Sequence, residues 1–282
     1  MTIAEFIGFR YFIVPDQANL FYRDGQNDDR REAFVSDVLA NREFEARRKV
    51  VIAITGVSSK NGLIFGKIGK RRTALLATRT EDDICSIPVE TWPFLHFVCE
   101  PTEQLIAVEW RSEPGFTIDS LRRTLEEHAA SQLRARGYVV RFAELVRRNA
   151  FWDLVTGAKV RSVRFTMSAP NLFGATAAAE DSLRTLSGIF NNTEIDVRLT
   201  NPMGKLRTPE DELRKYTEYC DRGGGRWEVT ISRGRKRERR KSADEVIKVS
   251  VDCDEGVSQE ALERAIEKVV GVACQLTGPS GP

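Results

Sequence analysis

The feature that most constrains the fold is a pair of short apolar segments followed closely by a helix pattern. Phe94–Cys99 and Leu105–Trp110 are rich in β-branched and aromatic residues, and a five-residue polar connection beginning at Glu100 separates them. So short a connection joins antiparallel strands, because a parallel crossover needs a dozen residues or more. Thr117–Arg136 then places leucines at helical spacing and ends at Gly137. A hairpin beside a helix argues against a doubly wound parallel sheet.

The rest of the chain repeats this mixture of strand and helix patterns. Further predicted strands are Phe6–Val14, Lys49–Gly56, Leu63–Ile68, Thr73–Thr78, Tyr138–Phe142, Val160–Met167, Ile195–Leu199, Trp227–Ser232 and Glu245–Val251. Further predicted helices are Asp28–Leu39, Ala175–Phe190, Pro209–Cys220 and Gln259–Gln275. The expected fold class is therefore α+β, with mixed, largely antiparallel sheets, packed helices and two subdomains.

The 282 residues are enough for one large domain or two ordinary ones. A boundary between two blocks of predicted elements falls around residues 148–159. We therefore expect an N-terminal α+β domain at residues 1–150, a C-terminal α+β domain at residues 151–277, and a disordered tail at residues 278–282. A single interleaved domain is the alternative.

Several features predict a cytoplasmic protein with no membrane insertion. No run of eighteen uncharged apolar residues occurs, and the N-terminus lacks the basic region of a secretory signal. The five cysteines are scattered and form no Cys-x-x-Cys pair. Both disulfide scaffolds and zinc sites need thiols that converge, so buried thiols are expected here, with no metal and no cofactor.

The strongest functional signal is a run of positive charge near the C-terminus. Residues 222–241 hold nine basic residues against two acids, whereas residues 242–268 hold eight acids against three bases. The run joins two predicted strands, so we expect a long, mobile hairpin tip whose cations contact phosphates. The candidate binding residues in it are Arg233, Arg235, Lys236, Arg237, Arg239, Arg240 and Lys241.

Two weaker basic clusters accompany this run. The first, which we expect to assist in phosphate binding, is Lys67, Lys70, Arg71 and Arg72. It is not a Walker phosphate loop, because Asn61 and Ile68 stand where that motif requires a glycine and a hydroxyl. The second is Arg147, Arg148, Lys159, Arg161 and Arg164. The nearby aromatic residues Phe151, Trp152 and Trp227 have apolar neighbours, which favours core packing over base stacking.

The sequence predicts no enzyme. The two histidines, His96 and His128, fall within a strand and a helix pattern and suit structural or surface roles. No Gly-x-Ser-x-Gly elbow is present. Asp252 and Asp254 could hold a hydrated magnesium ion, but Glu255-Gly-Val follows them where metal nucleases place a lysine. A metal-dependent nuclease is therefore the less favoured alternative.

A resemblance points in the same direction. The stretch Ser86-Ile-Pro-Val-Glu-Thr-Trp-Pro-Phe-Leu-His-Phe-Val, then Ile106-Ala-Val-Glu-Trp, and then Val160-Arg-Ser-Val-Arg-Phe-Thr-Met resembles RexA-like phage exclusion proteins and small proteins of phage-defence loci. It covers about residues 50–200 in order and spacing, with few identities. The resemblance implies a dimeric, sequence-independent binder of duplex DNA that acts in superinfection exclusion or abortive infection.

The expected function is therefore non-catalytic, backbone-directed binding of duplex DNA by a homodimer in a phage exclusion or anti-phage system. The main alternative is a protein-interaction or sensor module whose basic run contacts a partner protein from the same operon. In one version of that alternative, the acidic stretch after Ser242 pairs with the basic run of a second copy.

Overall fold

The computed structural model of the chain describes residues 2–15, 27–46, 49–79, 82–168, 194–234, 236–254 and 256–277, together with residues 185, 186, 189, 190 and 192. It confirms the α+β class with antiparallel sheets: every strand pair is antiparallel. The predicted tail at residues 278–282 and most of the predicted helix Ala175–Phe190 lie outside the described residues.

The larger of two main sheets has eight strands in the order β14-β1-β8-β7-β4-β3-β2, with β9 also paired to β1. Its strands are β1 (Thr2–Pro15), β2 (Arg42–Ala46), β3 (Val50–Lys60), β4 (Leu63–Lys70), β7 (Phe94–Glu100), β8 (Leu105–Glu109), β9 (Tyr138–Glu144) and β14 (Lys248–Cys253). The predicted hairpin is confirmed as β7–β8.

Strand β1 organises this sheet. Residues 6–10 pair with β8 along one edge. Along the other edge, residues 2–7 pair with β14 and residues 9–15 pair with β9. Most of the strand from Phe6 to Ile13 is buried. Its side chains alternate between two cores: Ile7 and Phe9 point to one face of the sheet and Phe6 to the other.

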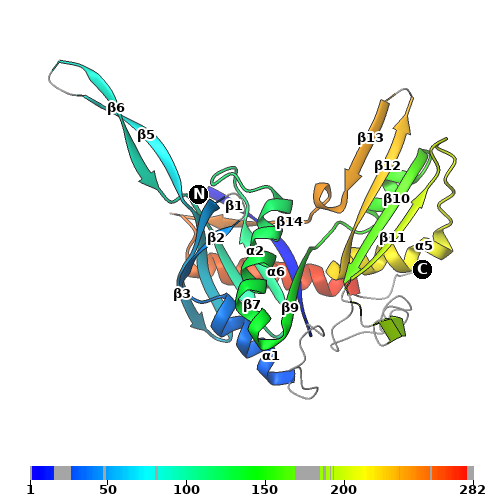
Figure 1. The fold of residues 1–282 in the computed structure, drawn as a ribbon, viewed down its shortest axis with the longest axis horizontal. Helices are drawn as coiled ribbons and strands as arrows, with labels where there is room; N and C mark the ends of the chain where they lie inside the picture. The colour runs from blue at the N-terminus through cyan, green and yellow to red at the C-terminus, as the bar shows by residue number, and fades with distance from the viewer. Residues whose placement is uncertain are drawn as a thin grey trace.

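Helices cover both faces of the large sheet (Figure 1). On one face lie α1 (Asn27–Ala33), the π-helical turn η1 (Phe34–Val38) and α2 (Ile118–Leu133), whose leucines pack on the sheet. The hydroxyls of Thr117 and Ser120 form a capping box that fixes the start of α2. On the other face lies α6 (Gln259–Thr277). None of the described helices combines the length and apolar character needed to cross a membrane.

The second sheet has four strands in the order β11-β10-β12-β13. They are β11 (Glu194–Thr200), β10 (Lys159–Ser168), β12 (Gly225–Arg233) and β13 (Lys236–Lys241). The inner face of this sheet, rich in Val, Phe and Trp, packs against α3 (Ala150–Val155) and α5 (Glu210–Tyr219). Phe151 and Trp227 are both buried here, which confirms core packing for these two aromatic residues.

Three short helical turns, η3 (Arg134–Arg136), η4 (Cys220–Gly224) and η5 (Ser242–Asp244), connect the larger elements. In η4, Gly223 ends the helix that begins with α5, since its φ of +80° lies in the left-handed region. A Cβ on Gly225 would lie 2.5 Å from the carbonyl oxygen of Thr166, so β12 can approach β10 only with glycine there.

The third sheet is a two-stranded arm, formed by β5 (Arg72–Arg79) and β6 (Ile84–Thr91). It projects away from the large sheet, on the same side of the molecule as the β12–β13 hairpin (Figure 1). The sequence predicted β5, but not its partner strand.

The chain does not divide simply at residue 150. Strands β10 to β13 form the second sheet, but β14 and α6 return to the large sheet and complete it. The expected C-terminal domain of residues 151–277 therefore describes the second sheet and not residues 248–277, which belong with β1.

Candidate nucleic-acid interface

The basic run at residues 233–241 is an ordered strand over most of its length. Arg233 pairs with Lys236 at the end of the β12–β13 hairpin, and β13 continues from Lys236 to Lys241. The hairpin expected from the sequence is confirmed, but the expected long tip is wrong, because strand pairing extends as far as Arg233 and Lys236. Arg235 lies outside the described residues.

Ion pairs within the chain neutralise three of the predicted binding residues. Arg240 lies 2.6 Å from Glu245 and 3.0 Å from Glu238. Arg239 bonds to Glu228, and Lys241 Nζ lies 3.0 Å from Asp119 Oδ2. Hydrogen bonds to these carboxylates raise the pKa values of Arg239 and Arg240.

The acidic stretch after Ser242 takes part in this pairing. Glu245 contacts Arg240 of the same chain, and Asp244 lies 3.8 Å from it. Arg147 lies 3.4 Å from the same Glu245. These two carboxylates therefore already have basic partners within one copy of the chain.

Strand pairing gathers cations on the outer face of the second sheet, opposite its apolar core. The register places side chains of alternate residues on this face, and the bulged Arg161 reaches it by donating a hydrogen bond to Ser232. Its cationic members are Lys159, Arg161, Arg164, Arg198, Arg226, Arg237, Arg239 and Lys241. Its acidic members are Glu194, Asp196 and Glu228. Hydroxyls of Ser162, Thr166, Thr200, Thr230 and Ser232 fill positions between them.

The acids of the outer face are themselves engaged. Asp196 accepts hydrogen bonds from Arg164, and this partner holds the pKa of Asp196 below its usual value. Glu194 lies 3.9 Å from Arg226, and Glu228 binds Arg239. With the acids engaged in this way, the remaining cations leave the outer face with a clear excess of positive charge.

On this face and its hairpin tip, five exposed cations form no ion pair with any described residue. Lys159, Arg198 and Arg237 lie on the outer face, and Arg233 and Lys236 lie at the hairpin tip. Arg198 stands directly opposite Arg164 on the neighbouring strand, an arrangement of like charges that an anion would relieve. These five are therefore the side chains most able to bind phosphates.

The sequence identified only part of this surface. The predicted cluster containing Lys159, Arg161 and Arg164 was not connected to the run at residues 233–241, yet β10, β12 and β13 bring the two together. Arg198 and Arg226 were missed altogether. The available signal was the alternation of polar and apolar residues in Ile195–Leu199 and Trp227–Ser232, which marks a sheet with one polar face.

The cluster at Lys67–Arg72 lies elsewhere, at the base of the arm. Lys67 and Arg111 contact the Phe94 ring, at 4.7 and 5.2 Å from its centroid. Lys70 lies over Phe116, and burial lowers its pKa. Arg71 lies 4.0 Å from Glu90, and Arg72 bonds to the carbonyl of Pro114. The structure therefore does not bring these four residues onto the outer face of the second sheet.

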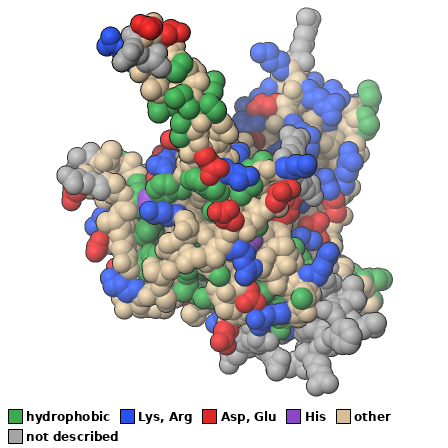
Figure 2. All heavy atoms as spheres, turned by 60° about the vertical axis from the view of Figure 1, so that its left-hand side comes forward, with side chains coloured by type: hydrophobic (Ala, Val, Ile, Leu, Met, Phe, Trp, Pro, Cys, Tyr) green, Lys and Arg blue, Asp and Glu red, His purple; other side chains and the backbone are tan. Residues whose placement is uncertain are grey.

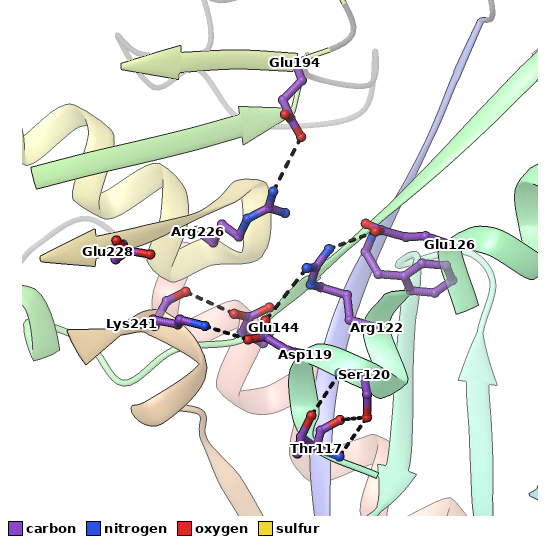
Figure 3. A network of polar contacts seen from close by, with 12 residues as sticks. Thr117, Asp119, Ser120, Arg122, Glu126, Glu144, Glu194, Arg226, Glu228 and Lys241 are labelled. Atoms are coloured by element: carbon purple, nitrogen blue, oxygen red, sulfur yellow. Dashed lines mark hydrogen bonds and ion pairs between the residues drawn. The ribbon is translucent and has the colours of Figure 1, made fainter. Parts of the chain in front are cut away.

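A polar cleft separates the outer face from the large sheet. It has a volume of about 510 Å³, and its walls are α2 and β9 on one side and the second sheet on the other. Lys241 bonds to Asp119 across it (Figure 3). Ser242 Oγ donates to Glu144 Oε1 over 3.0 Å. The outer face of the second sheet thus meets α2 through charged and hydroxyl groups.

Glu144 is the most unusual group in this cleft. It is buried, and its Oε2 has no hydrogen-bond donor among the described residues. Burial raises the pKa of its carboxyl. Beside it, burial alone would raise the pKa of Asp119 as well, but the ammonium of Lys241 and the guanidinium of Arg122 lower it. Asp119 therefore carries the negative charge that holds Lys241.

The other candidate catalytic residues occupy structural positions. His128 is buried, with Nε2 2.8 Å from the carbonyl of Val38, and it stacks on Phe44. His96 Nδ1 lies 2.7 Å from Glu109 Oε2. Within the described ranges, no three His, Cys, Asp or Glu side chains cluster as ligands for a metal ion, including around Asp252 and Asp254.

Comparison of the chain with protein-family models found no match, and comparison with curated proteins found none either.

Proposed function

We propose that this protein binds the phosphate backbone of duplex DNA through the outer face of the second sheet, without catalysing a reaction. The observation that carries the proposal is the group of five exposed, ion-pair-free cations on that face and its hairpin tip: Lys159, Arg198, Arg233, Lys236 and Arg237. A role in phage exclusion or defence rests on the sequence resemblance alone.

The chemistry of this face suits phosphate more than bases. Arginine donates paired hydrogen bonds to phosphate oxygens, and serine and threonine hydroxyls are common additional donors to the DNA backbone. Of the aromatic residues beside the basic clusters in the sequence, Phe151 and Trp227 are buried in the core, so these two cannot stack on unpaired bases. Backbone contacts without base contacts would give binding of weak sequence preference.

The dimensions are also compatible with a duplex. Strand β10 has ten residues and, at about 3.3 Å per residue, extends for roughly 33 Å. This length corresponds to roughly ten base pairs at the 3.4 Å spacing of phosphates along each strand. With five phosphates neutralised, one by each of the five free cations, the logarithm of the affinity should fall against the logarithm of the salt concentration with a slope of about −4.5.

The test is fluorescence anisotropy with a labelled random-sequence duplex, titrated at several salt concentrations with and without magnesium. The variant Lys159→Gln/Arg198→Gln/Arg237→Gln removes three of the free cations and should make the slope less steep by about 3. A matched control, Lys215→Gln/Arg264→Gln/Lys268→Gln, removes the same charge from α5 and α6. It should leave the slope close to that of the natural chain.

An intact probe with a steep slope that only the first variant changes supports the proposal. Equal slopes for the two variants would show that net charge, and not this face, determines binding. Absence of binding at low salt would overturn the proposal, and cleavage of the probe only with magnesium would favour the nuclease.

A further inference from the structure

The arm, defined as β5 and β6 (residues 72–79 and 84–91), exposes apolar side chains along its length (Figure 2). The exposed fractions are 73% for Leu75, 58% for Leu76, 69% for Ile84, 45% for Ile87 and 37% for Val89. These five are half of the large apolar residues that the described part of the chain leaves exposed. Contiguous apolar surface of this kind marks an interaction site.

The register shows that both faces of the arm are apolar. Leu76 stands opposite Ile87 and Ala74 opposite Val89 on one face. Leu75 stands opposite Pro88 on the other face. A two-stranded ribbon is only marginally stable on its own in water, so a surface that covers one of these faces would stabilise it.

The two ends of the arm carry opposite charge. Its base carries Lys70, Arg71 and Arg72, with Glu90 as the one acid. Its tip carries Asp82 and Asp83, with Arg79 as the one cation. The arm therefore runs from a basic base, through an apolar middle, to an acidic tip.

We propose that the arm pairs with the arm of a second copy of this chain, antiparallel and face to face. Two-fold symmetry then places the tip of each arm beside the base of the other, so Asp82 and Asp83 meet Arg71 and Arg72 twice, and the apolar middle meets itself. An anionic membrane surface or a DNA backbone would instead be repelled by the acidic tip. The second copy is the occupant that fits all three parts of the arm.

The size of the arm predicts a weak, reversible dimer. Eight residues at about 3.3 Å each and two strands give a face of roughly 26 by 10 Å, or about 260 Å² in outline. Stable complexes bury about 800 Å² on each partner. The dimer should therefore form in the micromolar range and dissociate on dilution.

The test is sedimentation velocity of the full chain over micromolar to hundred-micromolar concentrations. Reductant is needed because Cys274 is exposed and Cys85 is only partly buried, so either could form intermolecular disulfides. Leu76→Lys places a charge in the apolar middle and should weaken the dimer more than about tenfold. The control Met203→Lys changes a side chain in the turn after β11 that is 77% exposed. It should leave the dimer unchanged.

A charge exchange tests the direction of pairing without touching the apolar middle. Asp82→Lys alone and Arg71→Glu alone should each weaken the dimer by roughly three- to tenfold, because each change breaks an exposed ion pair at both ends of the symmetric dimer. The two changes together should restore it. A natural chain that stays monomeric throughout, a dimer indifferent to Leu76→Lys, or a double variant as weak as the single ones would each overturn the proposal.

Discussion

Replacing the buried Asp221 by Asn should make the protein more stable at neutral pH and abolish part of its pH dependence. Asp221 lies in η4, between α5 and β12, and is only 5% exposed. Burial raises the pKa of its carboxyl to about 7 from an ordinary 3.8. The backbone of Asn149, the indole of Trp227 and the charge of Arg148 offset only part of that increase, while Glu218 adds to it.

The direction in which stability changes with pH follows from the proton that Asp221 holds in the folded chain. Between about pH 4 and pH 7 the folded chain holds a proton on Asp221 that the unfolded chain has released. Unfolding therefore releases a proton, and the stability contributed by this residue falls as the pH rises through that range. Above the folded pKa it changes no further, because both states are then ionised.

The magnitude follows from the two pKa values. They differ by about three pH units, and each unit corresponds to about 1.36 kcal/mol, so the total is about 4 kcal/mol. An asparagine has the same shape and no charge to bury. The difference in unfolding free energy between Asp221→Asn and the natural chain should therefore grow by about 4 kcal/mol from about pH 4 to pH 8.

Urea unfolding followed by tryptophan fluorescence at several pH values measures this difference directly. Asp254→Asn, at an exposed aspartate, is the control and should give a nearly constant difference. A difference for Asp221→Asn that is equally flat, or that grows toward low pH, would refute the reasoning and place a charge-stabilising partner near Asp221.

Two further predictions concern the packing of the second sheet and its contact with α2. Trp227→Ala should lower the free energy of unfolding by about 3–5 kcal/mol, because the indole is buried against Phe151 with ring centroids 5.6 Å apart. A loss below about 1 kcal/mol in urea unfolding would contradict that packing. A double-mutant cycle of Lys241→Met and Asp119→Asn should give a coupling below about 1 kcal/mol that shrinks at high salt, since both side chains are partly exposed. A larger, salt-independent coupling would mean that this pair is shielded from water.

The sequence predicted elements whose pattern is local. The spacing of leucines and the capping Thr117 identify α2, and the alternation in Val160–Met167 identifies β10, because one buried face imposes the period of each element. The hairpin β7–β8 follows for the same reason, since its connection is short and polar.

The sequence did not reveal pairings between distant segments. Glu245–Val251 was correctly predicted to contain a strand, but no local pattern shows that β14 pairs with β1. Strand β13 was interpreted as a loop because all six of its residues are charged. It is an edge strand with polar surroundings on both faces, where Arg240 and Glu238 bond to each other instead of entering the apolar core.

The candidate site could also be predicted from the sequence only in part. The basic run at residues 233–241 could be recognised from composition, but its division into paired and free cations depends on partners such as Asp119 and Glu228, which come from other elements. The outer face of the second sheet could not be assembled until the order β11-β10-β12-β13 was known.

The pairing of β1 with β14 has a consequence for synthesis on the ribosome. Strand β1 acquires one of its three partners only after residues 248–253 have been translated, and α6, which covers one face of the same sheet, emerges later still. Until then the nascent chain exposes an unpaired strand edge and an apolar sheet face, which are the surfaces that chaperones bind and that drive aggregation. Slow translation of the second sheet would prolong that exposure, so expression yield should depend on how quickly the ribosome reaches the last helix.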